Sequence, residues 1–236
     1  MKSINNISNS FERTIKDTDL QNTATGLGEL IIDGVLKDGV LKDIPIIGTI
    51  VGLGKTASNV KDNLFLRKII YFLSEIKKVN VTERNKMISK IEDSKKYRVK
   101  VGEKLLYIID KCNDHINSEY IAKMFNAFVS EKISYNEFLR SSIIIQSILI
   151  SDLEEFISKE YYYFEKRYDN EWREYIDDFE SSLVNSGLCI ITTEKVKLEE
   201  NRWSDDLEIK GGNIEIKVTD IGKKINEILI TNANNV

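Results

Sequence analysis

The sequence predicts a mainly α protein: an N-terminal helical hairpin or bundle, followed by a C-terminal α+β module with a small antiparallel sheet. Three observations predict this class. The 236 residues include a single proline, Pro45, and only 12 glycines, so few positions interrupt a helix. Apolar residues recur at helical spacing over most of the chain before residue 160. Alternation typical of strands begins only after Gly187.

Composition limits the classes of function. The chain is 42% hydrophobic and 31% charged, which suits a protein that buries a core. Its net charge of -4 gives no overall basic footprint for nucleic acid, although a local basic patch stays compatible with it. Cys112 and Cys189 are far apart in the sequence and form no CxxC motif, which argues against a disulfide framework or a cysteine zinc site. We expect no cofactor and no metal.

The first residues contain no apolar core of a secretory signal, and no segment approaches the ~18 uninterrupted apolar residues of a membrane span. We therefore expect a cytoplasmic protein, with peripheral association at the inner membrane as the alternative. Residues 1–24 are rich in Asn, Ser and Thr. They are expected to form a flexible N-terminal arm, with at most a short helix from Phe11 to Ile15.

Residues 25–112 are expected to form a helical domain with a glycine-rich hairpin. Apolar residues recur at helical spacing over 27–42, where the pentapeptide DGVLK occurs twice in succession. A period of five rotates by about 140° on a helix, so the two copies do not share a face. Asp43 and Pro45 are helix-start signals, and they predict a second helix over 45–78.

The rest of this domain and the start of the next follow from the same periodicity. Residues 80–100 are polar and are expected to separate helices, and KLLYIIDKC resumes a helix at 104–112. Residues 113–236 are expected to form the second domain, which begins with helices over 118–129 and 133–160. Ser134 and Glu137 have the spacing of a capping box at the start of the longer helix.

The last part of the chain changes its period. EWREYIDDFESSLVNSG predicts a helix that ends at a C-cap glycine, Gly187. LCIITTEKVKL predicts a strand and ENRWSDD a loop. LEIKGGNIEIKV alternates around Gly211 and Gly212, which predicts a hairpin with a Gly-Gly turn. TDIGKKINEIL predicts the final helix.

This ending resembles the winged-helix family. The similarity is carried by a helix closing on SGLC, a strand, a wing loop, a second strand, and IKVTDIGKKINEIL, which is similar to the V-T-x-x-G junction between strand and helix in these domains. It covers roughly residues 118–230. The whole chain also resembles bacterial proteins that carry an IPIIGT-type glycine-rich helical hairpin before such a module. The resemblance implies a winged-helix-like fold and no particular activity.

The stretch GTIVGLGKT, residues 48–56, nearly matches a nucleotide-binding P-loop. The Walker pattern needs a glycine five positions before the glycine of GKT, and that position is Thr49. A P-loop also needs a parallel sheet, whereas the following sequence is helical by pattern. We therefore do not expect Lys55 and Thr56 to hold a phosphate.

Gly48 and Gly52 form a GxxxG spacing, which lets two helix backbones approach closely in lipid or in a tight hairpin of a folded domain. Burial within the fold is the preferred interpretation. The run from Ile44 to Gly54 carries no charge, so release of the hairpin into a membrane or onto a partner stays open. The residues of this candidate surface are Ile44, Pro45, Ile46, Ile47, Gly48, Ile50, Val51, Gly52 and Leu53.

Two catalytic interpretations are weaker. Asp206, Glu215 and Lys217 have the spacing of a magnesium-dependent nuclease, in which carboxylates hold the metal and a lysine aids the attacking water. The alternation of Ile214, Ile216 and Val218 instead favours a solvated hairpin face for Glu215 and Lys217. His115 is the sole histidine and lies near Cys112, without an evident acid to orient it.

In DNA-binding winged helices, a recognition helix enters the major groove beside phosphates. The equivalent segment here carries five carboxylates over Glu171–Glu180 against Arg173 alone, which disfavours nucleic acid. A contact led by the wing stays open, through Lys195, Lys197, Arg202, Trp203 and Lys210.

The leading hypothesis is a non-enzymatic bacterial intracellular effector of the toxin or phage-defence type. Its hairpin would engage a membrane or a partner on release, and its winged-helix-like module would serve as an interaction platform. A protein partner or self-association is expected. The alternative is a winged-helix DNA-binding regulator, and the third hypothesis is a divergent magnesium nuclease.

Overall fold

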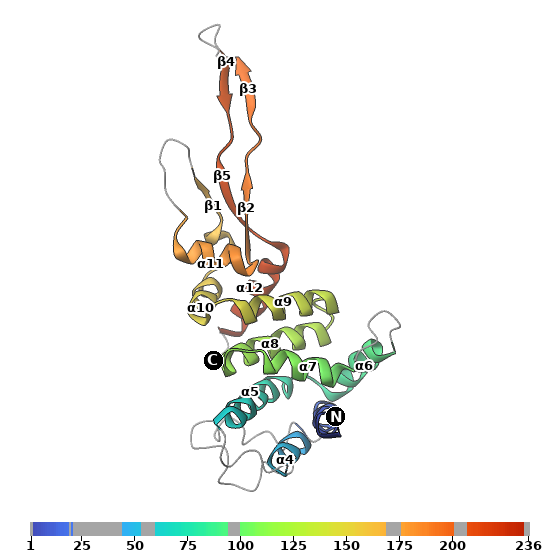
Figure 1. Cartoon of the computed structure of the whole chain (residues 1–236). Helices are drawn as coiled ribbons and strands as arrows, with labels where there is room; N and C mark the ends of the chain where they lie inside the picture. The colour runs from blue at the N-terminus through green and yellow to red at the C-terminus, as the bar shows by residue number, and fades with distance from the viewer. Residues whose placement is uncertain are drawn as a thin grey trace. The chain divides into compact units, whose positions relative to one another are not determined.

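The computed structural model describes residues 2–18, 20, 44–52, 60–93, 100–168, 176–200 and 207–233. The protein is mainly α with a small antiparallel sheet, which confirms the predicted fold class (Figure 1). The chain divides into two compact units, Met1–Ser142 and Ile143–Val236. The boundary that the sequence predicts after residue 112 falls inside the first unit, because α8 (His115–Val129) packs along α5 (Val60–Ile76).

The first unit is a helical bundle. Its remaining helices are α1 (Lys2–Lys16), α4 (Pro45–Gly52), α6 (Val81–Glu92), α7 (Val101–Asp110) and the first part of α9 (Tyr135–Ser147). Aromatic rings form its centre: the centroids of Phe125 and Phe138 lie 5.4 Å apart, and those of Phe72 and Phe125 lie 6.2 Å apart. Phe72 comes from α5 and Phe125 from α8, so α5, which lies within the helix predicted over 45–78, contributes to the core.

The prediction of a flexible arm over residues 1–24 is wrong for the described part of that range, because Lys2–Lys16 forms helix α1. Phe11 and Ile15, one helical turn apart, are fully buried, and the ring of Phe11 lies 5.9 Å from that of Phe72. Asn6 and Asn9 are exposed on this helix, whereas Ser8 is buried. Burial of the apolar side of the helix outweighs the low helix propensity of these residues.

Helix α6 lies within the stretch 80–100 that was expected to separate helices. Asn80 caps it by accepting a hydrogen bond from the N–H of Thr82 at 2.7 Å. Met87, Ile88 and Ile91 face inward, so three apolar positions at helical spacing suffice to anchor an otherwise polar helix.

The single helix expected over 133–160 is two helices, α9 and α10 (Ile150–Ser158). Leu149 between them has the extended backbone of an N-cap, with φ of -63° and ψ of 140°. Neither proline nor glycine marks this break in the sequence. The predicted capping box is confirmed: Ser134 N–H donates to Glu137 Oε2 at 2.7 Å, and Glu137 N–H donates to Ser134 Oγ at 3.3 Å.

The second unit combines helices with two antiparallel ladders. Its elements after α10 are η3 (Tyr161–Phe164), β1 (Lys166–Tyr168), α11 (Asp178–Ser186), β2 (Cys189–Thr193), β3 (Lys197–Glu200), β4 (Leu207–Lys210), β5 (Ile214–Val218) and α12 (Asp220–Ala233). Strand β5 is central in the sheet β1-β5-β2, and β3 pairs with β4. The core of this unit includes Leu183, Leu188, Ile216, Val218, Ile225 and Leu229.

The predicted hairpin around Gly211 and Gly212 is wrong. Strands β4 and β5 do not pair with each other; β4 pairs with β3 and β5 with β2, so β2–β3 and β4–β5 form the two sides of one long arm (Figure 1). The glycines, with φ of +91° and +81°, kink this arm. A Cβ on Gly211 would lie 2.3 Å from the carbonyl oxygen of Lys195, so the kink requires glycine there.

The V-T-x-x-G segment joins β5 to α12 through one threonine. Thr219 N–H donates to the carbonyl of Leu188 at 2.9 Å, and the Thr219 hydroxyl accepts from the N–H of Gly222 at 3.0 Å, as a helix N-cap does. A Cβ on Gly222 would lie 2.3 Å from the same Leu188 carbonyl. Gly187, the predicted C-cap of α11, is confirmed in the left-handed conformation with φ of +90°.

Candidate partner-binding surface

The uncharged stretch 44–52 forms α4 and packs on α1. The N–H of Ile46 donates to the Thr14 hydroxyl at 3.1 Å, and the hydroxyls of Ser10 and Thr49 are hydrogen-bonded at 2.7 Å. Of the candidate hairpin residues, Ile44, Ile46, Ile47 and Ile50 are buried, and Pro45, Gly48 and Val51 are half-buried.

Gly52 is exposed, and no described atom lies within 4 Å of a Cβ placed on it, so this half of the GxxxG spacing marks no close helix contact in the fold. Leu53, Lys55, Thr56 and the segment expected to be a helix over 27–42 lie outside the described residues. Within the described part of the chain, every helix is too short or too polar to span a lipid bilayer.

Helix α11 begins at Asp178, and Asp177 is its N-cap. The helix was expected to begin at Glu171, but Ile176 and Asp177 are not helical, and residues 171–175 lie outside the described residues. The Glu180 carboxylate turns inward, is 5% exposed, and binds Lys166 Nζ and the Tyr168 hydroxyl. Burial alone raises the pKa of the Glu180 carboxyl, but hydrogen bonds from Lys166, Tyr168 and the N–H of Asp177 outweigh it, and the pKa is lowered. The expected acidic face is thus reduced, among the residues described, to the exposed Asp177 and Asp178.

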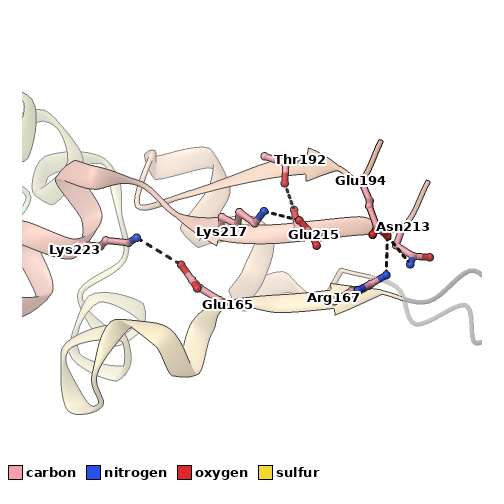
Figure 2. Close-up of polar contacts among 8 residues, drawn as sticks. All are labelled: Glu165, Arg167, Thr192, Glu194, Asn213, Glu215, Lys217 and Lys223. Atoms are coloured by element: carbon pink, nitrogen blue, oxygen red, sulfur yellow. Dashed lines mark hydrogen bonds and ion pairs between the residues drawn. The ribbon is translucent and has the colours of Figure 1, made fainter. Parts of the chain in front are cut away.

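Polar side chains lie along one face of the sheet β1-β5-β2 (Figure 2), which also carries the exposed Ile190 opposite Lys217. The Arg167 guanidinium and the Asn213 amide both donate to Glu194 Oε2, at 2.6 and 3.1 Å. Arg167 comes from β1, and Glu194 and Asn213 from the base of the arm, so this cluster ties the arm to the edge strand. Sequence reasoning missed it because the three residues come from segments that only the fold brings together.

Glu215 and Lys217 lie on the same exposed face and pair with each other at 2.6 Å (Figure 2). The hydrogen bond from Lys217 lowers the pKa of the Glu215 carboxyl, and the same bond raises the pKa of the Lys217 ammonium. Ile216 and Val218 are buried on the other face, as the alternation predicts. Asp206 lies outside the described residues, and the described ones contain no group of three His, Cys, Asp or Glu suited to a metal. The nuclease hypothesis therefore gains no support.

Cys112 and His115 do not form a nucleophile–base pair. Burial raises the pKa of the Cys112 thiol to about 12, which leaves it protonated, and its Sγ donates to the carbonyl of Ile108 at 3.5 Å. His115 is instead the first residue of α8, and its ring lies 4.3 Å from that of Tyr71.

The outer part of the arm, formed by β3 and β4 and called the β3–β4 arm below, has two different faces. Leu198 is directly opposite Ile209, and Lys197 is directly opposite Lys210. Because neighbouring side chains on a strand point to opposite faces, the apolar pair occupies one face and the lysine pair the other. Leu198 is 66% exposed, Ile209 is 72% exposed, and the neighbouring Val196 is 63% exposed. The alternation in KVKL and LEIK signals these apolar positions, but alternation alone does not show that they stay exposed.

The predicted basic wing is brought together in part. Lys195, Lys197 and Lys210 are exposed on the arm, whereas Arg202 and Trp203 lie outside the described residues. The arm therefore offers an apolar pair on one face and a lysine pair on the other, where the register also places Glu199 opposite Glu208. Comparison of the chain with protein-family models, with curated proteins and with solved structures gives no significant match.

Proposed function

We propose that this chain is a non-enzymatic interaction protein whose second unit joins a second copy of the chain through the apolar face of the β3–β4 arm. The observation that carries the proposal is the exposed cross-strand pair Leu198–Ile209. A two-stranded ribbon is only marginally stable in water. Covering its apolar face removes that surface from solvent and stabilises the ribbon.

A second copy is favoured as the occupant because the apolar face is self-complementary. Opposed residues of an antiparallel ribbon are related by a local two-fold axis, so two ribbons packed face to face place the Leu198–Ile209 pair against the same pair of the second copy. Lys197 and Lys210 then point away from the contact, which keeps like charges apart. The short strands predict a small interface and hence a weak, concentration-dependent dimer.

A winged-helix-like identity of this unit is supported by three features: the order of helix, strand, arm, strand and helix from α11 to α12; the central place of β5; and the Thr219–Gly222 junction. Such a module can bind nucleic acid or protein, so the choice depends on its surface. Recognition helices present their N-terminal residues to the major groove. Here that end of α11 carries Asp177 and Asp178, which repel phosphates.

Sedimentation velocity of the full chain over a wide concentration range tests this proposal. Leu198→Glu combined with Ile209→Glu should shift the chain to monomer. Ile143→Glu, which replaces an isoleucine of similar exposure, 64%, outside the arm, and Lys197→Glu, on the opposite face of the same strand, should leave association unchanged. A chain that is monomeric throughout, or a dimer that survives the double substitution, rules the arm contact out.

DNA binding through the arm is the second candidate, because Lys197 and Lys210 lie directly opposite each other and form a compact basic pair. A duplex bound in this way should dissociate steeply as salt rises. Lys197→Glu with Lys210→Glu should abolish the gel shift, and Arg202→Glu should weaken it. Unchanged DNA binding by the Lys197→Glu, Lys210→Glu variant would exclude a role of the lysine pair.

The effector hypothesis, of the toxin or phage-defence type, concerns the first unit. It is supported by α4, which carries no charged residue and is joined to α1 by the hydroxyls of Ser10, Thr14 and Thr49. Engagement of a membrane by α4 requires its release, because Ile46, Ile47 and Ile50 are buried in the fold. Induced expression in a bacterial host, followed by measurement of membrane potential and growth, tests the effector hypothesis.

A further inference from the structure

The first unit contains a cavity of about 280 Å³ between the N-terminal half of α5 and the junction of α7 with α8. Leu64 and Phe65 form an apolar wall, and Lys61, Arg67 and Lys68 bring three cationic side chains from the same helix. The volume is at the lower end of that of small-molecule sites. The cavity therefore combines an apolar surface with a concentration of positive charge.

Two carboxylates, Asp110 and Asp114, also line the cavity and offset the three cations only in part. The Asp114 carboxylate already accepts hydrogen bonds from the N–H groups of Ile116 and Asn117, as the N-cap of α8. Asp110 is exposed, and its carboxylate is screened by solvent. Of the cations, Lys68 donates to the carbonyls of Asp110 and Cys112 at the end of α7. Arg67 and Lys61 line the cavity from the same helix.

Arg67 and His115 both lie against the ring of Tyr71. The Arg67 guanidinium carbon lies 5.8 Å from the centre of the Tyr71 ring, and the His115 ring lies 4.3 Å from it. Burial lowers the pKa of His115, and the charge of Arg67 lowers it further, against the opposing charges of Asp114 and Glu119. Arg67 Nε is buried and has no hydrogen-bond partner in the part of the chain that the structure describes. Buried donors of this kind are nearly always paired, so an acceptor is expected there.

We propose that this cavity binds a small organic oxyanion, a phosphate or carboxylate on an apolar body. Arg67 and His115 contact the oxyanion, Lys61 contributes charge at the rim, and Phe65 packs against the apolar body. A guanidinium fork suits both phosphate and carboxylate, which is why the class includes both. The residues of this site all belong to the first unit, and the proposal does not depend on the proposed function.

The single histidine of the chain makes the test direct. In untagged full-length protein, the Cε1–H resonance of His115 is followed by NMR during titration with phenyl phosphate, benzoate, inorganic phosphate and benzylamine. Phenyl phosphate or benzoate should produce a saturable shift and raise the pKa of His115, because a nearby anion favours imidazolium. Inorganic phosphate should bind more weakly, since it lacks the apolar body.

Matched variants identify the contact. Arg67→Gln should weaken binding roughly tenfold or more, because a charge-assisted hydrogen bond is lost. Lys61→Gln, at the rim and unable to disturb the core, should weaken it less, and Arg140→Gln, an exposed arginine on α9, should not change it. Tighter binding of benzylamine than of the anions, no saturable shift, or unchanged affinity in both Arg67→Gln and Lys61→Gln would overturn the proposal. Equal binding of inorganic and phenyl phosphate would overturn the role assigned to Phe65.

Discussion

At the scale of single residues, two helical glycines have opposite surroundings. A Cβ on Gly222 would lie 2.3 Å from the Leu188 carbonyl oxygen and 2.9 Å from Val218 Cγ1, whereas one on Gly52 would meet no described atom within 4 Å. Gly222→Ala should therefore destabilise the second unit by roughly 1–3 kcal/mol through overpacking against backbone. Gly52→Ala should be neutral or stabilise by up to about 1 kcal/mol, because alanine favours helix. Urea unfolding of both variants checks the contrast, and equal effects would contradict it.

Glu180 makes a residue-scale prediction about pH. Because its pKa is lowered in the fold, its contribution to stability is complete above the unfolded-state value of about 4.3 and is lost as pH falls through the folded value. Glu180→Gln should cost roughly 1–3 kcal/mol at pH 7, since the charged partner of Lys166 and Tyr168 is lost. The difference from the unsubstituted protein should shrink below pH 4.

Urea unfolding at pH 7 and pH 3 measures this difference. Glu154→Gln, an exposed glutamate on α10, is the control and should change stability little at either pH. A cost at pH 3 as large as at pH 7 would show that Glu180 acts through packing and not through charge.

At the scale of elements, the sequence predicts what periodicity and capping control. The mainly α class, the Ser134–Glu137 capping box and the Gly187 C-cap are confirmed. Errors arise where tertiary contacts decide. Helix α1 is stabilised by burial of Phe11 and Ile15, and the kink at Gly211 arises because β4 pairs with β3 across the arm. The sequence alternation around Gly211 and Gly212 is compatible with a tight hairpin turn as well as with the observed kink.

The candidate sites likewise contain features that the sequence predicts and features that only the fold creates. The orientation of Glu215 and Lys217 follows from strand alternation, and the sequence predicts it. The inward turn of Glu180 does not follow from the sequence, because its partners Lys166 and Tyr168 come from β1. The cavity beside Arg67 was missed for the same reason, since Lys68 of α5 and Asp110 at the α7–α8 junction, which both line it, are 42 residues apart in the sequence.

Helix α4 carries an element-scale prediction on membranes. Gly52→Leu has open space in the fold, so it should leave the stability of the folded protein nearly unchanged. If α4 inserts into lipid through its GxxxG spacing, the same substitution should abolish leakage of anionic liposomes, because close helix approach is lost. Dye release from the liposomes measures the leakage. Leu149→Ala, which changes an exposed residue outside α4, is the control. Leakage that persists in Gly52→Leu, or is absent in the unsubstituted protein, argues against insertion through this spacing.

At the scale of the whole molecule, the two units offer different chemistry. The first unit buries its aromatic core and the uncharged helix α4, and it holds the cationic cavity. The second presents Val196, Leu198 and Ile209 on the arm, outside its own core. A chain with net charge -4 that exposes such a face is expected to associate weakly and reversibly with itself.

Self-association predicts how the stability of the whole chain depends on its concentration. If the arm joins two copies in the folded state only, mass action raises the unfolding midpoint as protein concentration increases. Over the range in which the dimer is populated, a hundredfold increase should raise the midpoint by roughly 3–5 °C. The Leu198→Glu, Ile209→Glu variant should show no such dependence, and Ile143→Glu should retain it. Differential scanning calorimetry measures the midpoints. A midpoint independent of concentration in the unsubstituted chain, at concentrations where sedimentation detects dimer, would mean that the dimer forms through a surface that does not require the folded arm.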